Sequence, residues 1–168
     1  MPHYPVPTQT ELEDLAAELG TRLLATGQTL ATAESCTGGW VAQCLTAIAG
    51  SSAWFDRGFV TYSNQAKTDM LGVPEAILMA HGAVSEPTAI AMVEGALAHS
   101  QADWAVSITG IAGPAGGTVE KPVGTVCFAW AERDREVSVA TQHFGGTRSE
   151  VRAQAVVFAI NQLQVAIN

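Results

Sequence analysis

The fold follows from the stretch Leu30-Ala31-Thr32-Ala33-Glu34-Ser35-Cys36-Thr37-Gly38-Gly39-Trp40. Its first five residues predict a short buried strand, and its two glycines predict a tight turn into a helix over 40–48. Backbone N–H groups collect at the start of such a helix, where they bind a phosphate or a developing oxyanion. Ser35 lies at the point of this strand–turn–helix unit where an attacking hydroxyl would be exposed.

Helical and extended patterns alternate on both sides of this stretch. We expect strands over 54–63, 103–109, 125–132 and 136–144, and helices over 11–26, 65–71, 74–81, 87–99 and 148–165. Thr10 with Glu13 predicts a capping box at the first helix, and Asn64 is the expected N-cap of the second of these. The alternation predicts an α/β fold, a three-layer α/β/α sandwich with a mixed sheet. A chain of 168 residues fits a single domain, which we place over 10–168 after a tail over 1–9.

The charge balance excludes one large class of partner. The chain has 8 basic and 16 acidic residues, a formal net charge of −8, whereas a protein that binds nucleic acid needs a basic stripe to neutralise phosphates. A small phosphorylated ligand is still compatible, because one helix N-terminus and one or two arginines suffice to bind it. Only 14% of the residues are charged, which indicates much buried surface and is compatible with a homodimer.

Cysteine and histidine usage predicts neither a disulfide framework nor a metal site. The three cysteines, Cys36, Cys44 and Cys127, form no CxxC pair, which indicates reduced thiols in a cytoplasmic protein. The four histidines are scattered without HxxH spacing, so we expect no metal and no cofactor. The segment over 1–10 lacks the apolar centre of a signal peptide, and no apolar run reaches the roughly 18 residues of a membrane span.

Three loops rich in glycine and hydroxyl groups each follow a predicted strand. They are Glu34–Gly39, Tyr62–Lys67 and Ser107–Gly117. In open α/β sheets, ligands bind at the carboxyl ends of strands, so we expect the three loops to meet at one site. The long third loop is expected to be functional, since loops of this length inside a compact domain rarely serve only as connections.

Ser35 and Lys67 are the residues of these loops best suited to catalysis. A lysine in an apolar pocket loses its proton readily and can act as the base that an isolated serine hydroxyl needs. The structural alternatives are a Ser35 or Thr37 that only caps a helix and a Lys67 that is solvated. Cys36 is a rival nucleophile because a helix N-terminus lowers a thiol pKa, but it has no histidine nearby in the sequence, and we favour a spacer role for it.

The sequence resembles the CinA C-terminal family in motifs that occur in family order over nearly the whole chain. These motifs are Thr32–Gly39, Tyr62–Asn64 with Lys67, Gly82–Glu86, Thr109–Pro114 with Gly116 and Gly117, Lys121–Gly124, and Arg148 with Arg152. The resemblance implies that Ser35, Tyr62 and Lys67 form a catalytic group that works without metal. The expected substrate-contacting residues are Glu34, Cys36, Thr37, Gly38, Gly39, Asn64, Thr109, Gly110, Gly113 and Arg148.

Members of this family with deamidase activity convert nicotinamide mononucleotide to nicotinate mononucleotide and ammonia, in pyridine nucleotide salvage. By resemblance we expect the same reaction here, through an acyl group on Ser35, with Lys67 taking the Ser35 proton directly or through Tyr62. Backbone N–H groups of the 37–39 turn would stabilise the oxyanion, and Thr109, the 110–117 loop or Arg148 would hold ribose or phosphate. The alternatives are a nucleotide-binding regulatory module without catalysis and a serine amidase for another small carboxamide.

Overall fold

The computed structural model describes residues 5–168, and within them five strands form one sheet in the order β2-β1-β3-β4-β5. The strands are β1 (Leu30–Glu34), β2 (Phe55–Val60), β3 (Trp104–Gly110), β4 (Thr125–Glu132) and β5 (Ser138–His143). The helices are α1 (Gln9–Thr26), α2 (Trp40–Thr46), α3 (Asn64–Leu71), α4 (Glu75–His81), α5 (Glu86–Ala98) and α6 (Arg148–Ala166), with a short 3-10 turn η1 (Ser51–Ala53). Residues 1–4, part of the predicted tail over 1–9, lie outside the described residues.

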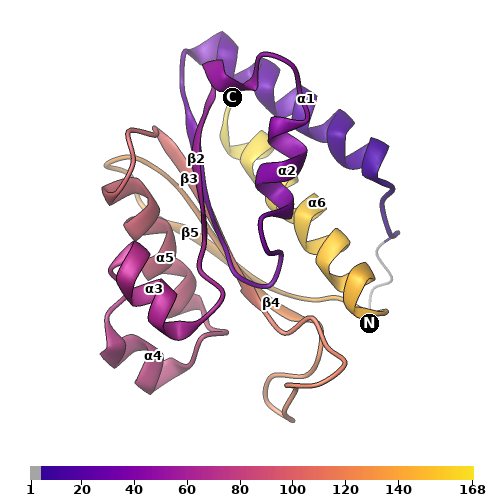
Figure 1. Cartoon of the computed structure of the whole chain (residues 1–168), viewed down its shortest axis with the longest axis vertical. Helices are drawn as coiled ribbons and strands as arrows, with labels where there is room; N and C mark the ends of the chain where they lie inside the picture. The colour runs from indigo at the N-terminus through magenta and orange to yellow at the C-terminus, as the bar shows by residue number, and fades with distance from the viewer. Residues whose placement is uncertain (1–4) are drawn as a thin grey trace.

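The sheet is mixed and covered by helices on both faces. β2, β1 and β3 run parallel, whereas β4 and β5 continue the sheet as an antiparallel hairpin. Figure 1 shows α1, α2 and α6 on one face of the sheet and α3, α4 and α5 on the other. This arrangement confirms the predicted three-layer α/β/α fold with a mixed sheet in a single domain.

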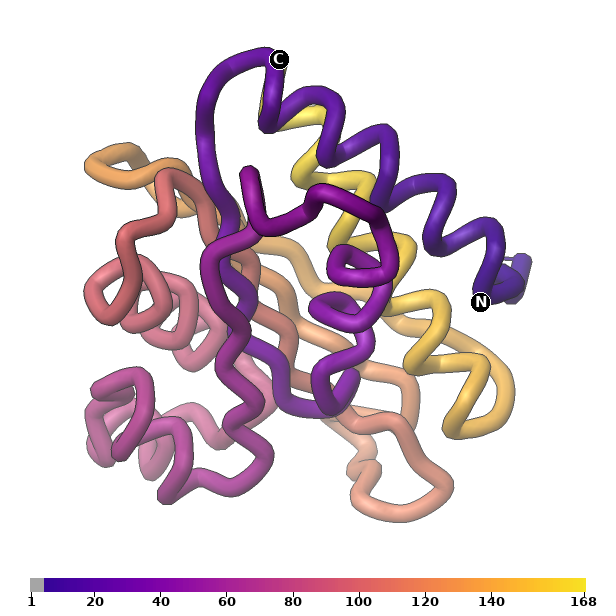
Figure 2. Tube along the Cα trace, turned by 45° about the horizontal axis from the view of Figure 1, so that its top comes forward, coloured from indigo at the N-terminus to yellow at the C-terminus, as the bar shows by residue number. Residues whose placement is uncertain are grey.

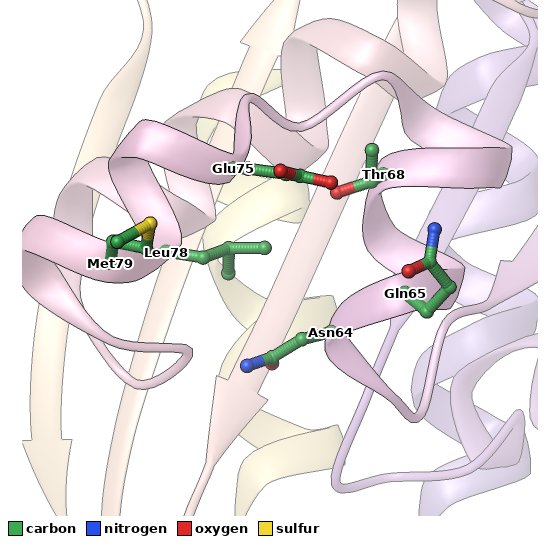
Figure 3. A pocket seen from close by; sticks show the side chains of 6 residues that line it. All are labelled: Asn64, Gln65, Thr68, Glu75, Leu78 and Met79. Carbon is green, nitrogen blue, oxygen red and sulfur yellow. The ribbon is translucent and has the colours of Figure 1, made fainter.

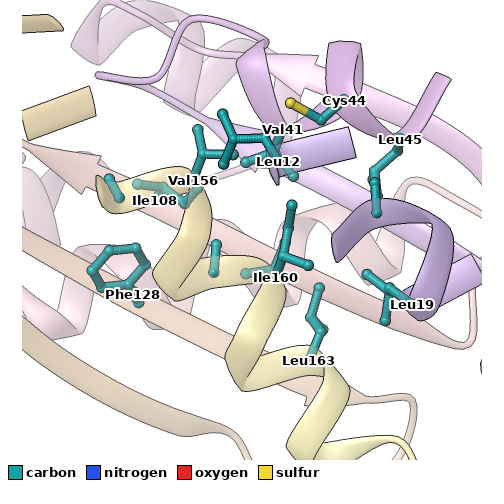
Figure 4. Packing of buried hydrophobic residues seen from close by; sticks show 14 of the residues in the cluster. Leu12, Leu19, Val41, Cys44, Leu45, Ile108, Phe128, Val156, Ile160 and Leu163 are labelled. Atoms are coloured by element: carbon teal, nitrogen blue, oxygen red, sulfur yellow. The ribbon is translucent and has the colours of Figure 1, made fainter. Parts of the chain in front are cut away.

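The larger of two hydrophobic cores lies between the sheet and the layer of α1, α2 and α6. Leucines of α1 pack with side chains of α2, the central strands and α6 (Figure 4). α1 and α6 lie side by side along the sheet in both overall views (Figure 2), and the amide of Gln164 donates to the backbone oxygen of Leu15 at 2.8 Å. α6 is therefore anchored along its length, so its first turns are held firmly beside the sheet.

Two predicted helix caps are wrong by one or two residues. The capping box of α1 is formed by Thr8 and Glu11 rather than by Thr10 and Glu13, because the Thr-x-x-Glu pattern occurs twice in the sequence and only the packed helix decides between the two. Ser63 rather than Asn64 caps α3, with its hydroxyl accepting from the amide of Ala66 at 3.0 Å. Serine and asparagine are about equally good N-caps, so propensity could not separate these neighbours.

Gly20 in the middle of α1 is explained by a close contact with Trp54. A Cβ atom at this position would lie 2.6 Å from two ring carbons of Trp54, a residue that is itself almost fully buried. Glycine lowers helix stability by roughly 1 kcal/mol relative to alanine. Here its missing side chain leaves the space that the buried ring of Trp54 occupies.

Candidate active site

The turn after β1 is shaped by a buried carboxylate. Glu34 is 1% exposed, and its Oε1 accepts hydrogen bonds from the Thr37 hydroxyl at 2.7 Å and from the amide of Val41 at 2.9 Å. Its Oε2 accepts from the amide of Ala42 at 3.1 Å. Glu34 therefore caps α2 from inside the protein. This is a different role from the substrate contact expected from the sequence.

Ser35 and Lys67 meet directly, although 32 residues separate them in the chain. Lys67 Nζ lies 3.1 Å from Ser35 Oγ and donates to the backbone oxygen of Thr61 at 2.8 Å. Lys67 is 1% exposed and Ser35 is 8% exposed. Burial lowers the pKa of Lys67 below its ordinary value of 10.5, because the charged ammonium loses its hydration. The pair thus has the short contact that a serine and a general base require, and burial shifts Lys67 toward its neutral form.

A cavity of about 170 Å³ opens above this pair at the carboxyl ends of the parallel strands. Its lining residues come from all three glycine-rich loops and from the connection between α4 and α5: Ser35, Cys36, Tyr62, Lys67, Ala83, Val84, Thr109, Gly110, Ala112 and Arg148. We call this cavity the Ser35 pocket. The structure thus brings the three loops together at one site, as expected for loops that follow the carboxyl ends of strands in an open α/β sheet.

Tyr62 and Arg148 form the rim of the Ser35 pocket. Arg148 Nη2 donates to the Tyr62 hydroxyl at 2.8 Å, and Arg148 Nη1 donates to the backbone oxygen of Gly113 at 2.8 Å. Tyr62 is 61% exposed. In this arrangement the Tyr62 hydroxyl is paired with Arg148 rather than with Ser35 or Lys67, and among residues 5–168 the side chain that hydrogen-bonds to the Ser35 hydroxyl is that of Lys67.

A family model for the CinA C-terminal domain matches residues 12–167. This chain belongs to the CinA C-terminal domain family. The chain is 56% identical over 156 residues to the nicotinamide-nucleotide amidohydrolase PncC of Escherichia coli K12, covering 93% of this chain and 94% of that protein. It is 54% identical to the protein of the same name from Enterobacter agglomerans, covering 91% and 93%.

A solved structure from the same family has the same fold. The competence/damage inducible protein CihA of Agrobacterium tumefaciens superposes with a TM-score of 0.91 at 48% identity, covering 98% of this chain and 99% of that one. As regards other features, none of the helices in residues 5–168 has the length and apolar character of a membrane span. Nor does that part of the chain gather three or more metal-ligating side chains at one place.

Several residues expected to contact substrate in this CinA-family chain lie beside the Ser35 pocket rather than in it. Thr37, Gly38 and Gly39 line a neighbouring cavity of about 350 Å³, together with Trp40, Gln43 and Arg152. Asn64 lines a third hollow between α3 and α4, where it faces Leu78 and Met79 (Figure 3). Gly113 contributes its carbonyl oxygen to Arg148. Sequence spacing placed these residues near the site but could not assign them to one side of a loop.

Ala83 and Val84 line the Ser35 pocket but were not among the expected site residues. The hydroxyl of Thr109 donates to the backbone oxygen of Ala83 at 2.7 Å, which ties this wall to the end of β3. Both residues fall inside the Gly82–Glu86 motif of the family. That motif was the available signal, but Ala83 and Val84 themselves carry no reactive side chain.

Cys36 has the properties of a spacer rather than of a nucleophile. Burial is the largest cause that raises the pKa of its thiol to about 12, and the Glu34 carboxylate raises it further. The thiolate, which is the reactive form, is therefore disfavoured at neutral pH. This agrees with the spacer interpretation and not with the lowered pKa that a helix N-terminus alone would give.

Four of the eight basic residues line the Ser35 pocket or contact residues that line or adjoin it, and none of the four has a carboxylate partner. They are Lys67, Lys121, Arg148 and Arg152; in residues 5–168 the only ion pairs within 4.0 Å are Arg57–Asp56 and Arg135–Glu132. Lys121 reaches this region from the loop after β3, since its Nζ donates to the backbone oxygen of His81 at 2.8 Å. In a chain of net charge −8, this edge of the sheet is therefore suited to an anionic ligand.

Proposed function

We propose that this protein hydrolyses the carboxamide of nicotinamide mononucleotide to nicotinate mononucleotide and ammonia, with Ser35 as nucleophile and Lys67 as base. The observation that carries the proposal is the 3.1 Å contact between Lys67 Nζ and Ser35 Oγ in a buried pocket. The substrate is suggested by the two relatives named nicotinamide-nucleotide amidohydrolase, each of which this chain matches over more than 90% of its length.

The reaction proceeds by acyl transfer in two halves. Ser35 Oγ attacks the carboxamide carbon while its proton passes to neutral Lys67, and a backbone amide of the turn stabilises the oxyanion. The C–N bond then breaks, and the leaving nitrogen takes the proton from Lys67 to depart as ammonia. Water attacks the resulting ester and gives a proton to Lys67, which returns it to Ser35 Oγ as the acid is released. No step requires a metal ion.

The unpaired cations recognise the phosphate of the substrate. Arg148 is the first candidate, because it lies on the rim of the Ser35 pocket and has only neutral partners. An arginine fork matches a phosphate group and binds it more strongly than neutral acceptors. Engagement of Arg148 by phosphate also frees the Tyr62 hydroxyl, which can then approach Ser35 and Lys67 as the proton relay that the family resemblance implies.

The test of this function is the measurement of both products with purified protein in the presence of a chelator. We expect stoichiometric ammonia and nicotinate mononucleotide from nicotinamide mononucleotide, and slower release from nicotinamide, which lacks ribose and phosphate. Loss of activity with the chelator that returns on adding a metal ion would contradict the metal-free mechanism. Binding of the nucleotide without ammonia release would instead indicate a non-catalytic binding module.

Replacing Arg148 by glutamine is expected to raise the KM for nicotinamide mononucleotide about 10- to 100-fold. The estimate corresponds to one charge-assisted hydrogen bond to phosphate, worth roughly 1.5–3 kcal/mol. Steady-state kinetics with the nucleotide and with nicotinamide riboside, which lacks the phosphate, measures this effect. The riboside should show little change in KM, and an equal increase for both substrates would exclude a phosphate contact. Arg135→Gln is the matched control, because that side chain is 76% exposed in the β4–β5 turn.

Composition predicts a cytoplasmic location and a homodimer, and both stay predictions. All three cysteines are free and buried, which supports a reducing, cytoplasmic location for the protein. The homodimer inferred from the low charged fraction is to be tested by sedimentation.

A further inference from the structure

Arg152 lies on α6, one helical turn beyond Arg148. Its side chain contacts the turn over 36–39, which directly follows Ser35. Its Nε donates to the backbone oxygen of Cys36 at 3.0 Å, and its Nη2 donates to the backbone oxygen of Thr37 at 3.1 Å. The guanidinium carbon lies 5.4 Å from the ring centroid of Trp40 at the start of α2. These contacts tie two consecutive peptide groups of the turn to a long helix that is packed along α1.

The contacts with Arg152 fix the direction of these peptide groups as well as their position. In a trans peptide the C=O and the N–H point in opposite directions, and the peptide between Cys36 and Thr37 is trans. Because the Cys36 oxygen points at Arg152, the N–H of Thr37 points away from α6. Arg152 lies in the neighbouring cavity and does not line the Ser35 pocket, so it acts on the turn from behind.

The amide of Thr37 is an unusual donor. Thr37 is fully buried, and its N–H has no acceptor among residues 5–168. Buried backbone amides are nearly always paired in folded proteins, so an unpaired one indicates a place for a ligand atom. The next amide, that of Gly38, already donates to the backbone oxygen of Ser35 at 3.0 Å. Within the 37–39 turn, Thr37 is therefore the fully buried residue whose amide is left for an oxyanion, and the amide of Cys36 before it likewise has no backbone acceptor among residues 5–168.

We propose that Arg152 is a positioning residue that keeps the Thr37 amide directed at the oxyanion formed when Ser35 attacks. Without the guanidinium, the Cys36–Thr37 peptide can rotate, and its N–H then no longer meets the developing charge. A donor of this kind acts on the transition state rather than on the bound substrate. Loss of Arg152 should therefore lower kcat and leave KM nearly unchanged, whereas loss of Arg148 should mainly raise KM. This inference rests on the proposed amidase function.

The test compares Arg152→Ala and Arg152→Lys with Arg135→Ala, which removes the same charge from an exposed site away from the pocket. For Arg152→Ala we expect kcat for ammonia release to fall about 10²-fold, the size of effect that a displaced catalytic geometry produces, with KM within about threefold of wild type. Arg152→Lys should recover only part of kcat, because one ammonium cannot reproduce the planar fork. Millimolar guanidinium should raise kcat of Arg152→Ala at least about fivefold without raising that of wild type.

A second measurement makes the result independent of the substrate. A fluorophosphonate reagent phosphonylates Ser35 with loss of fluoride and leaves a phosphoryl oxygen where the oxyanion would form, so its labelling rate should fall in parallel with kcat in Arg152→Ala. An unchanged kcat, an effect confined to KM, or a loss that only follows the unfolded fraction in melting experiments would overturn the role of Arg152. Wild-type protein that labels at Ser35 but releases no ammonia would contradict the proposed function alone, and labelling rates would then decide on Arg152. Absence of both reactions in wild type would overturn both proposals.

Discussion

Replacing Ser35 by alanine is expected to abolish ammonia release from nicotinamide mononucleotide, lowering kcat by at least about 10⁴-fold, as loss of the nucleophile does in serine hydrolases. The alternative nucleophile cannot replace it, because the pKa of the Cys36 thiol is raised to about 12 by burial. The fold should be preserved, since Ser35 is anchored by its backbone, with its amide donating to the backbone oxygen of Ile108 at 2.9 Å. Turnover and melting temperature together measure both effects.

The Ser35 experiment has a covalent readout and a matched control. Acid quenching of wild type during turnover should trap the nucleotide as an ester on the peptide that contains Ser35, and mass spectrometry should find no such adduct on Ser35→Ala. Ser138→Ala removes a hydroxyl from an exposed position of β5 and should behave as wild type. A folded Ser35→Ala protein with more than about 1% of wild-type kcat would exclude Ser35 as the nucleophile.

The sequence predicted best what depends on short-range pattern. β1 occupies the expected residues, Leu30–Glu34, because its mostly small and apolar residues are followed, after three further residues, by two glycines that favour a turn. Gly38 and Gly39 adopt φ of +60° and +97°, which L side chains rarely adopt, so the turn is encoded locally. Because β1, β2 and β3 run parallel, the loops that follow them lie at the same end of the sheet, so the rule that ligands bind at the carboxyl ends of strands predicted the general location of the site.

What the sequence could not predict is the direction in which side chains of the same loop point. Glu34 and Ser35 are adjacent, yet the carboxylate turns inward to cap α2 while the hydroxyl meets Lys67. Arg148 and Arg152 similarly lie one turn apart on α6, yet Arg148 lines the Ser35 pocket and Arg152 lines the neighbouring cavity. These choices depend on where α6 packs and on which buried polar groups need partners, and both are properties of the whole fold.

Replacing Lys67 by methionine is expected to lower kcat about 10³-fold or more, because Ser35 loses the group that accepts its proton. In wild type, kcat should fall as the pH drops through the lowered pKa of Lys67, since only the neutral amine acts as a base. Methionine has a similar volume and should keep the fold. Arg135→Met, which removes an exposed positive charge, is the control and should keep wild-type kcat and its pH profile.

The same substitution tests the burial of Lys67 through stability, independently of catalysis. The pKa of Lys67 is lowered in the folded protein, so between that pKa and 10.5 the unfolded chain binds more protons than the folded one. The unfolding free energy of wild type should therefore increase relative to Lys67→Met as the pH rises through this window, and the difference should become constant above it. Urea unfolding at a series of pH values measures this difference, and titrations shared by both proteins cancel. If the difference in unfolding free energy between the two proteins stays constant or decreases with pH, folding does not lower the pKa of Lys67. The folded protein would then lack the neutral base that the proposed Ser35 reaction requires.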